Sequence, residues 1–315
     1  MRDVFLVCEG THGQIDQRVL DSLVITAHGV PARIKPAGGS SSLGALRTFL
    51  EQEATRGPAA ASIVRPAVFT VKDRDFQPLV KAAATWADIS CHQLIWRRHE
   101  IENYLVEPAV VHTWFETLRL KPPPRMAVAQ LPTTLAQVET LIESLARDLL
   151  EHHVGQLVFA EIQQSCRYYT DTTQLSRPAR SGSVVLDPNR SPAPKRRDWL
   201  NALNVEWRRV ERNRHKSGRI PSWTTSRIRQ QFDARFTDLS LPSYFAQKTY
   251  LLDFEGKGLL WALSNWLRQL TGISISNDQL ESDLIGVLPT AYSQFQPYQP
   301  DEFLDLATRM KLASR

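Results

Sequence analysis

The string VFLVCEG, at positions 4–10, sets the beginning of the fold, because five apolar residues run directly into an acid and a glycine. The string AVFTVKDRD, at positions 67–75, likewise ends a mainly apolar run with two acids. Short runs rich in β-branched and aromatic residues are typical of buried strands. Segments with helical spacing lie between these runs, so we expect βα units on a parallel sheet.

Around these two strings the same pattern places further elements. The expected elements are strands at 32–35 and 91–96 and helices at 15–27, 43–53 and 78–86. After residue 101, helical spacing recurs at 110–120, 134–151, 156–169 and from Gly256 through Leu267. We therefore predict an α/β fold with an N-terminal domain of residues 1–108 and a mainly helical domain of residues 109–315. Residues 170–195, rich in Ser, Pro, Arg and Asp, are expected to form an exposed loop or a disordered insertion.

The composition of the 315 residues, with 42% apolar and 23% charged residues, is typical of a soluble globular protein. No run approaches the ~20 apolar residues of a membrane span. The first apolar run is too short for a signal peptide and begins too near Met1, so we expect a cytoplasmic location and no membrane partner. Cys8, Cys91 and Cys166 lack paired spacing, which favours reduced thiols over a zinc site or a disulfide framework.

Positive charge is concentrated between residues 195 and 235, which hold twelve Lys or Arg residues against four Asp or Glu residues. The excess of eight is larger than the net charge of +5 of the whole chain. A polyanion is the natural partner, because each neutralised phosphate releases counterions. The alternative is a solvated helical face. Trp207 and Trp223 lie in this segment, but helix packing suits them better than base stacking. The candidate nucleic-acid contacts are Arg208, Arg209, Arg212 and Arg214.

Three acids follow predicted strands: Glu9 after the first, and Asp73 and Asp75 after the strand at 67–72. The carboxyl ends of parallel strands meet at one edge of a sheet, where ligands of open α/β sheets bind. In an extended segment Asp73 and Asp75 point to one side, and Lys72 and Arg74 point away. Carboxylates gathered this closely repel one another unless a cation neutralises them, and oxygen ligands favour Mg²⁺ or Mn²⁺. We predict one or two such ions; the alternative for the Asp pair alone is an ordinary turn.

The order of these motifs resembles the TOPRIM domain shared by topoisomerases, bacterial primases and OLD-family nucleases. The resemblance covers roughly residues 3–108 and rests on Glu9-Gly10, Asp16, Gly38-Gly39, Asp73-x-Asp75 and the string RHEIENYL at 98–105. That last string is similar to one in OLD-like nucleases and in standalone TOPRIM proteins of phage-defence systems. The resemblance implies a Rossmann-like parallel sheet, with Glu9, Asp73 and Asp75 as metal ligands and Glu9 also in proton transfer. Gly13 stands where the family usually has a second acid, which leaves Asp16, across a longer loop, as the candidate for that role.

Two further motifs have alternative interpretations. The resemblance favours Glu102 as a metal ligand or a neighbour of one, but Glu100 and Glu102 also suit the N-terminus of a helix starting near His99. The backbone N–H groups that follow Gly38-Gly39 are suited to a phosphate. An ordinary turn followed by a serine cap explains the same string equally well.

Lys257 is the candidate cation for stabilising charge on a phosphoryl group. It lies at the predicted start of a helix, and OLD-like nucleases carry a comparable lysine downstream of the TOPRIM core. The surrounding FEGKG string is not a P-loop, because it lacks the upstream Gly and the following Ser or Thr; the alternative is an exposed lysine. His12, His152 and His153 lack a further ligand at metal-binding spacing, so we expect them at the surface or in loops.

The motifs together predict a Mg²⁺- or Mn²⁺-dependent endonuclease acting on DNA or RNA, with Glu9 and Lys257 as catalytic residues. The resemblance to effectors of two-gene defence systems implies a toxic antiviral role, a separate ATPase as controlling partner, and a homo-oligomer. The main alternative is a non-catalytic interaction module whose metal site is structural or degenerate. A strand-passing or nucleotide-polymerising enzyme is disfavoured, because no additional domain of those enzymes is recognised.

Overall fold

The computed structural model describes residues 2–53, 65–123, 126–166, 184, 186, 192–212 and 223–315, without the side chains of 53, 165–166 and 209–212. Its centre is a four-stranded sheet in the order β2-β1-β3-β4, with every neighbouring pair parallel. The strands are β1 (Val4–Cys8), β2 (Ala32–Pro36), β3 (Ala67–Lys72) and β4 (Gln93–Ile95). In the register, Leu6 of β1 lies opposite Ile34 of β2 and Phe69 of β3. The expected parallel α/β sheet is confirmed.

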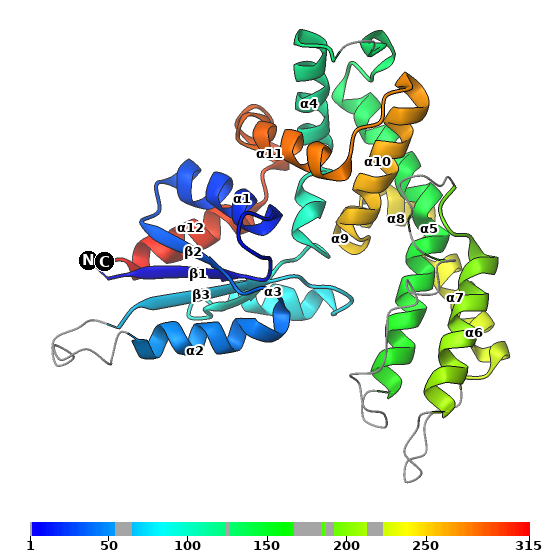
Figure 1. The fold of residues 1–315 in the computed structure, drawn as a ribbon, viewed down its shortest axis with the longest axis horizontal. Coiled ribbons are helices and arrows are strands. Elements are labelled where there is room, and N and C mark those ends of the chain that lie inside the picture. The colour runs from blue at the N-terminus through cyan, green and yellow to red at the C-terminus, as the bar shows by residue number, and fades with distance from the viewer. Residues whose placement is uncertain are drawn as a thin grey trace.

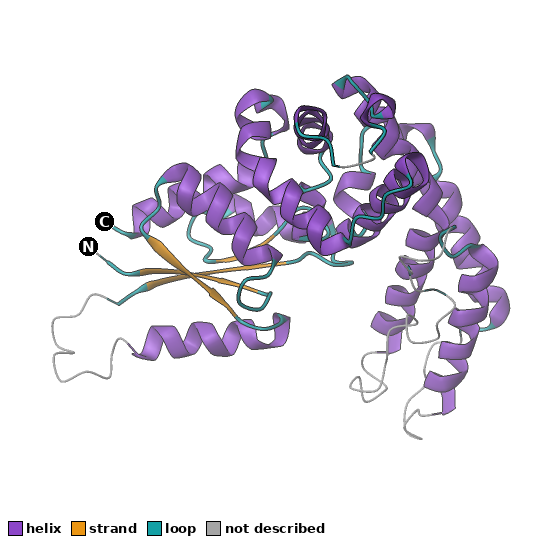
Figure 2. Cartoon of the chain, turned by 45° about the horizontal axis from the view of Figure 1, so that its top comes forward, coloured by secondary structure: helices purple, strands orange, loops and turns teal. Residues whose placement is uncertain are grey.

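Alternate residues of the two central strands face opposite sides of the sheet, as a period of two requires. On one side Val7 and Val68 pack with Leu43 and Leu50 of α2 (Leu43–Glu53). On the other side Leu6, Cys8 and Phe69 belong to the main core. Helix α1 (Ile15–Leu20), the π-helical segment η1 (Asp21–Thr26) and the last helix, α12 (Asp301–Ala313), lie over that second side (Figure 2). Helix α3 (Leu79–Ala87) joins β3 to β4.

The end of the chain returns to the sheet, so the two termini lie side by side (Figure 1). The Arg2 N–H donates to the Ser314 carbonyl at 3.1 Å. In α12, a carboxylate oxygen of Glu302 accepts from the Arg97 N–H at 2.8 Å, just beyond β4, and Arg309 donates to the Asp88 carbonyl at 2.7 Å. The spacing of apolar residues did not predict this return. The elements β1–β4, α1–α3, η1 and α12 are called the sheet lobe below.

The rest of the described chain is helical, as expected, and forms the helical lobe to the right of the sheet in Figure 1. Its helices are α4 (Pro108–Leu120), α5 (Leu135–Cys166), α6 (Arg196–Arg212), α7 (Thr225–Leu239), α8 (Pro242–Ala246), α9 (Tyr250–Asp253), α10 (Gly256–Thr271) and α11 (Asn277–Gln294). Short 3-10 turns are η2 (Ser40–Ser42), η3 (Ile101–Tyr104), η4 (Val128–Gln130) and η7 (Gln296–Tyr298). Most of the expected insertion at 170–195 lies outside the described residues.

Helix α5 differs from the sequence expectation, because one continuous helix of 32 residues replaces two separate helices at 134–151 and 156–169. Gly155 lies in the gap between the two expected stretches and has a packing role. A Cβ on Gly155 would lie only 2.0 Å from the ring of Trp199 on α6, so the glycine lets the indole lie against the helix backbone. Among the described helices, none combines the length and the apolar character that crossing a bilayer requires.

Candidate functional site

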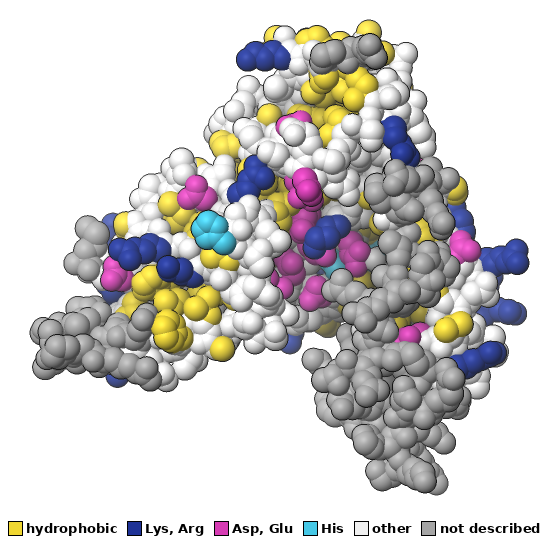
Figure 3. Space-filling view, in the orientation of Figure 1, with side chains coloured by type: hydrophobic (Ala, Val, Ile, Leu, Met, Phe, Trp, Pro, Cys, Tyr) yellow, Lys and Arg dark blue, Asp and Glu magenta, His cyan; other side chains and the backbone are white. Residues whose placement is uncertain are grey.

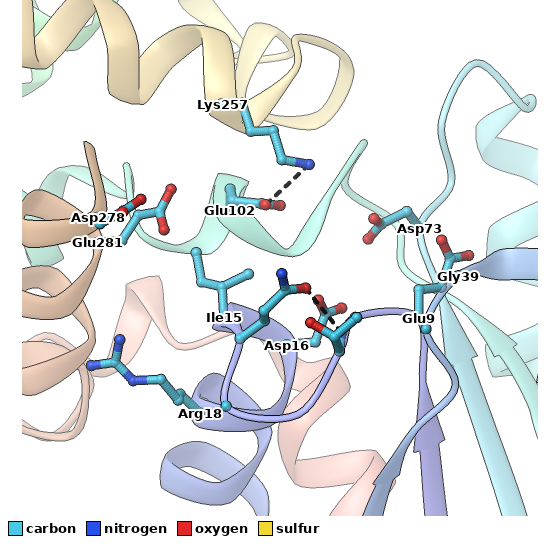
Figure 4. Close-up of a pocket in the computed structure, with 15 residues that line it drawn as sticks. Glu9, Ile15, Asp16, Arg18, Gly39, Asp73, Glu102, Lys257, Asp278 and Glu281 are labelled. Atoms are coloured by element: carbon cyan, nitrogen blue, oxygen red, sulfur yellow. Dashed lines mark hydrogen bonds and ion pairs between the residues drawn. The ribbon is translucent and has the colours of Figure 1, made fainter. Parts of the chain in front are cut away.

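A cavity of about 590 Å³ opens at the carboxyl end of the sheet, where the sheet lobe meets the helical lobe. In the space-filling view, acidic side chains gather in a hollow at the middle of the molecule around a cationic side chain (Figure 3). The cavity has two walls. The sheet wall consists of Glu9, Asp16, Arg18, Gly38, Gly39 and Asp73, and the helix wall of Glu102, Lys257, Asp278 and Glu281 (Figure 4).

The strand order explains why the first acids of the sheet wall are neighbours. Glu9 directly follows β1 and Asp73 directly follows β3, and these two strands are paired in parallel. Their carboxyl ends therefore reach the same edge. An Asp73 carboxylate oxygen accepts from the Ile101 N–H of η3 at 3.1 Å, which connects the edge to the helix wall. Glu9 Oε1 is buried and has no hydrogen-bond partner among the described residues.

Asp16 reaches the site although five residues separate it from Gly10. It lies in the first turn of α1, and a Cβ on Gly10 would lie 2.5 Å from Asp16 Oδ2. The intervening loop is held by its own side chains, because the Thr11 N–H donates to Gln14 Oε1 at 2.9 Å. The longer loop therefore brings Asp16 against the end of β1, beside Glu9.

Asp75 departs from the extended geometry expected for the Asp73-x-Asp75 pair. Strand β3 ends at Lys72, and Asp75 has a left-handed φ of 49° in the turn that follows. The turn points Arg74 inward, where it is buried and pairs with Asp253 at 2.8 Å, contrary to the expectation that it points away. Asp75 is exposed and lines a neighbouring cavity instead of the one that contains Asp73.

The glycine pair at the end of β2 has the conformation of a turn. Gly38 and Gly39 have φ values of 76° and 139°, a region that L side chains rarely adopt. The Gly38 N–H donates to the Gly10 carbonyl at 3.0 Å, so this donor is already engaged. Both glycines nevertheless line the cavity.

Lys257 lies at the acids rather than on an open surface. Its Nζ is 3.2 Å from Glu102 Oε1 and 3.4 Å from Glu100 Oε1, although 62% of its side chain remains exposed. The expected helix start is confirmed, since α10 begins at Gly256. Glu102 is buried, and its second oxygen, Oε2, has no hydrogen-bond partner.

Gly256 determines how closely the helix wall approaches the 3-10 turn η3. A Cβ on Gly256 would lie 2.4 Å from the Asn103 backbone nitrogen and 2.6 Å from the Glu102 carbonyl carbon. The Asn103 side chain donates to the Phe254 carbonyl at 2.8 Å and so fixes the same junction from the other side. Only a glycine permits this contact between backbones, and the contact places Lys257 beside Glu102.

The pKa shifts follow from burial and from crowding of like charges. Burial, followed by the charges of Asp75 and Asp16, raises the pKa of Glu9 to about 7. Burial and the charge of Glu102 raise the pKa of Asp73 well above its usual range. Burial and the charge of Glu100 raise the pKa of Glu102 to about 7, despite the nearby Lys257. Ionising all of these acids together is therefore unfavourable without added positive charge.

The pKa values of Lys257 and Asp16 are also shifted. Burial acts to lower the pKa of Lys257, but the carboxylates of Glu100 and Glu102 outweigh it and raise that pKa, so the ammonium stays charged. Burial also raises the pKa of Asp16. The lysine belongs to the helix wall, and the sheet wall has no comparably close ammonium among the ion pairs of the described residues.

The carboxylate oxygens of the cavity are suitable ligands for a hard divalent cation, but the side chains are not arranged to coordinate one. Carboxylate oxygens are the ligands that Mg²⁺ and Mn²⁺ prefer, and two buried ones, on Glu9 and Glu102, have no hydrogen-bond partner. Within the described part of the chain, however, no group of three or more His, Cys, Asp or Glu side chains is arranged to hold a metal ion. Cation binding here requires these side chains to rotate toward one another.

Three charged residues of the cavity were not predicted from the sequence. Asp278 and Glu281 lie in the first turns of α11, and Arg18 of α1 donates to Ser282 Oγ on the same helix at 3.0 Å. Acids near a helix N-terminus are common for electrostatic reasons alone, so no sequence signal distinguishes Asp278 and Glu281 from ordinary helix-start acids.

The predicted basic contacts are only partly described. Arg208 is an exposed residue of α6, whereas the side chains of Arg209 and Arg212 and all of Arg214 lie outside the described residues. Trp207 and Trp223 are buried, which agrees with helix packing.

The histidines correct a further expectation. His12 is exposed as expected, but His152 and His153 are buried in α5, because that helix lies in the middle of the helical lobe. Trp199 donates its indole N–H to His152 Nδ1 at 3.3 Å, and His153 stacks on Phe254 with 4.2 Å between ring centroids.

Comparison with known proteins found no relative. No protein-family model matches the chain, and neither the curated proteins nor the solved structures contain a match.

Proposed function

We propose that this protein is a nuclease of the TOPRIM type that hydrolyses phosphodiester bonds with the help of Mg²⁺ or Mn²⁺. The observation that carries the proposal is the convergence of Glu9, Asp16, Asp73, Glu102 and Lys257 on one cavity from five separate segments of the chain. These are the lysine and, except for Asp75, the acids expected from the sequence motifs, and the cavity lies at the sheet edge where α/β enzymes bind ligands.

The sheet wall supplies cation ligands in this proposal. Glu9 and Asp73 hold the ion, and Asp16 and Glu102 are further ligands or hold a second ion. A bound divalent cation would lower the charge repulsion among these acids and polarise a phosphoryl oxygen. The raised pKa of Glu9, about 7, suits Oε1 to accept or release a proton near neutral pH.

The helix wall supplies a positive charge for the phosphoryl group. In the attack of water on phosphorus, a P–O bond forms, the bond to the leaving oxygen breaks, and negative charge builds on the remaining oxygens. Lys257 Nζ lies beside the acids and can donate to one of those oxygens as its contact with Glu102 weakens. Glu100 and Glu102 hold the ammonium in place before substrate arrives.

The basic residues of α6 and the segment after it would add sequence-independent affinity for the nucleic-acid backbone. A toxic role in antiviral defence, a controlling ATPase and a homo-oligomer are further parts of this proposal, and they rest on the motif resemblance alone.

A second candidate function is a non-catalytic interaction module with a degenerate site. The observation in its favour is the lack of a ready-made coordination group among the described residues. On this interpretation the acids keep their raised pKa values, and no cation binds with appreciable affinity.

The experiment that separates the two functions is cleavage of labelled nucleic acid by the purified chain. Single- and double-stranded DNA and RNA are incubated with Mg²⁺, Mn²⁺ or EDTA. We expect cation-dependent cleavage of at least one substrate, lost in Glu9→Gln. The matched control is Glu51→Gln, which removes a partly exposed acid of α2 that pairs with Arg47 and lies outside both walls of the cavity. Cleavage that persists in EDTA or in Glu9→Gln rules out the proposed mechanism.

A further inference from the structure

A second cavity, of about 430 Å³, lies on the other side of Lys257. Lys257 lines both cavities, and Glu100 and Asp75 line only the second. Lys257 is therefore part of the wall of both spaces, and a ligand that contacts this residue can extend into either of them.

The walls of the second cavity differ in chemistry from those of the first. Four aromatic residues line it, from the turn after β3 and from three helices of the helical lobe; they are Phe76, Phe159, Trp199 and Trp261. The side-chain amides of Gln156, Gln163 and Asn277 line it as well. Flat apolar surface together with amide donors and acceptors is what binds the face and the edge of a planar heterocycle.

The aromatic walls are held by the surrounding packing, so the cavity is formed before a ligand arrives. Trp199 lies against Gly155 and donates to His152, and Phe159, Trp199 and Trp261 are each less than 10% exposed. Phe76 is the partly exposed member, in T-shaped contact with the His99 ring at 4.7 Å between centroids. It is the aromatic face most accessible to an incoming ring.

Lys257 is suited to an anionic group, and the aromatic cavity beside it is suited to a planar heterocycle. A nucleotide carries both groups in one molecule. We propose that the second cavity receives the nucleobase next to the phosphodiester that Lys257 contacts, so that the substrate is single-stranded or locally unpaired nucleic acid. This inference rests on the proposed nuclease function and names its substrate class. A base inside a duplex must first be unstacked and unpaired before it can enter a side cavity, whereas an unpaired base can be turned into one without that cost.

The test compares binding of three short oligonucleotides to the full-length protein, with Ca²⁺ in place of Mg²⁺ and intact ligands verified on a gel. The ligands are a single strand, a strand of the same length and charge whose sugars lack bases, and a duplex; DNA and RNA versions are measured in parallel by fluorescence anisotropy. Since stacking of a base on an aromatic ring contributes about 1–3 kcal/mol, we expect the single strand to bind about tenfold more tightly than the strand without bases.

Two variants locate the effect. Phe76→Ala removes the accessible aromatic face and Gln156→Leu removes an amide of similar size, and each should reduce the preference for bases severalfold without changing the affinity of the strand without bases. The control is Phe49→Ala, which removes an exposed aromatic residue of α2 on the far side of the sheet and should keep the preference. Gln156→Leu decides the question if Phe76→Ala does not fold.

The outcomes separate this inference from the function on which it rests. Equal affinity for strands with and without bases, equal affinity for the duplex, or a preference untouched by both cavity variants overturns the base site, even if the protein is a cation-dependent nuclease. A base preference that depends on Phe76 or Gln156, in a protein that cleaves nothing with any cation, keeps the base site and overturns the nuclease.

Discussion

The two walls of the acidic cavity differ in whether a lysine lies close to their acidic side chains. On the sheet wall, Glu9, Asp16 and Asp73 crowd one another, and their pKa values are raised. On the helix wall, Lys257 lies within 3.4 Å of both Glu100 and Glu102 and neutralises part of their charge. Under the proposed function, the sheet wall would take up a cation from solution, whereas the helix wall already carries Lys257, which would contact the phosphate.

The largest effect should come from the sheet wall. Asp73→Asn replaces a carboxylate with a neutral, poorer ligand, so we expect both weaker Mn²⁺ binding and a cleavage rate lower by about 10³-fold, equivalent to several kcal/mol. Excess Mn²⁺ should restore part of the activity. Calorimetric titration and single-turnover cleavage measure the two effects.

Asp75→Asn is the matched variant for that experiment, because Asp75 follows the same strand but lines the other cavity. Its effect on Mn²⁺ affinity should be much smaller than that of Asp73→Asn. Equal losses in the two variants would contradict the placement of the ion on the sheet wall.

The second prediction concerns Lys257, whose removal should separate rate from cation affinity. Lys257→Met keeps the aliphatic stem and removes the charge that stabilises the phosphoryl group, so the cleavage rate should fall by about 10²-fold. The same change leaves Glu100 and Glu102 without their ammonium partner, so Mn²⁺ affinity should stay constant or increase. A decrease in Mn²⁺ affinity would mean that the two walls do not divide the charge as proposed.

The third prediction tests the contact that joins the walls. Gly256→Ala places a Cβ 2.4 Å from the Asn103 backbone nitrogen, so backbone must move. We expect a loss of about 1–3 kcal/mol in the free energy of unfolding and a displaced Lys257 with reduced cleavage. Denaturant unfolding and cleavage rates measure both.

Gly286→Ala in α11 is its control, because nothing lies within 4 Å of the added Cβ. An alanine in an open helical position should raise the free energy of unfolding by about 0.5–1 kcal/mol. If Gly256→Ala and Gly286→Ala have the same cleavage rate and the same free energy of unfolding, the close approach of α10 to η3 has no role in positioning the lysine.

The sequence predicted one wall better than the other, for a physical reason. The apolar runs that become β1 and β3 are local patterns in the sequence. Once these strands are parallel neighbours, Glu9 and Asp73 at their carboxyl ends must lie at the same edge of the sheet. Asp75 was misplaced because a left-handed residue ended the extended geometry directly after β3. The helix wall depends on how α10 and α11 pack over long separations, so Asp278 and Glu281 could not be recognised, and only the motif resemblance suggested Lys257.

The same limit applies to the helical lobe. Apolar spacing predicted α10 to its first residue, because the amphipathic pattern and the N-terminal glycine are both local. It divided α5 between residues 151 and 156. Gly155, within that gap, is explained by Trp199, 44 positions away in sequence, whose ring a Cβ on Gly155 would meet at 2.0 Å. Buried His152 and His153 were assigned to the surface for a related reason: the neighbours that cover them come from other elements.

The smallest predicted effect is a difference in pH dependence between the acidic cavity and the helical core. Burial lowers the pKa of His152 from 6.5 to about 4, and burial together with His99 lowers the pKa of His153 well below 6.5. Neutral rings are therefore favoured in the folded protein. Their contribution to stability is present above about pH 6.5 and is lost as the pH falls toward 4.

Glu9 should act in the opposite direction. Its folded-state pKa is raised from 4.5 to about 7, so the stability it contributes in the protonated form is present below pH 4.5 and is lost as the pH rises through 7. In EDTA, unfolding of the wild type should therefore be compared with Glu9→Gln across pH 5–8 and with His153→Phe across pH 4–6.5. Phenylalanine keeps the stacking on Phe254, and both ring nitrogens of His153 lack hydrogen-bond partners, so the substitution removes the titration and little else.

We expect Glu9→Gln to gain stability relative to the wild type as the pH rises from 5 to 8, and His153→Phe to gain it as the pH falls from 6.5 to 4, each by an amount of the order of 1 kcal/mol. Saturating Mn²⁺ should cancel the first difference, because the cation stabilises the ionised Glu9, and should leave the second unchanged, because His153 lies in the core of the helical lobe. If the stability difference between Glu9→Gln and the wild type depends on neither pH nor Mn²⁺, a cation does not reduce the charge repulsion among the carboxylates of the sheet wall.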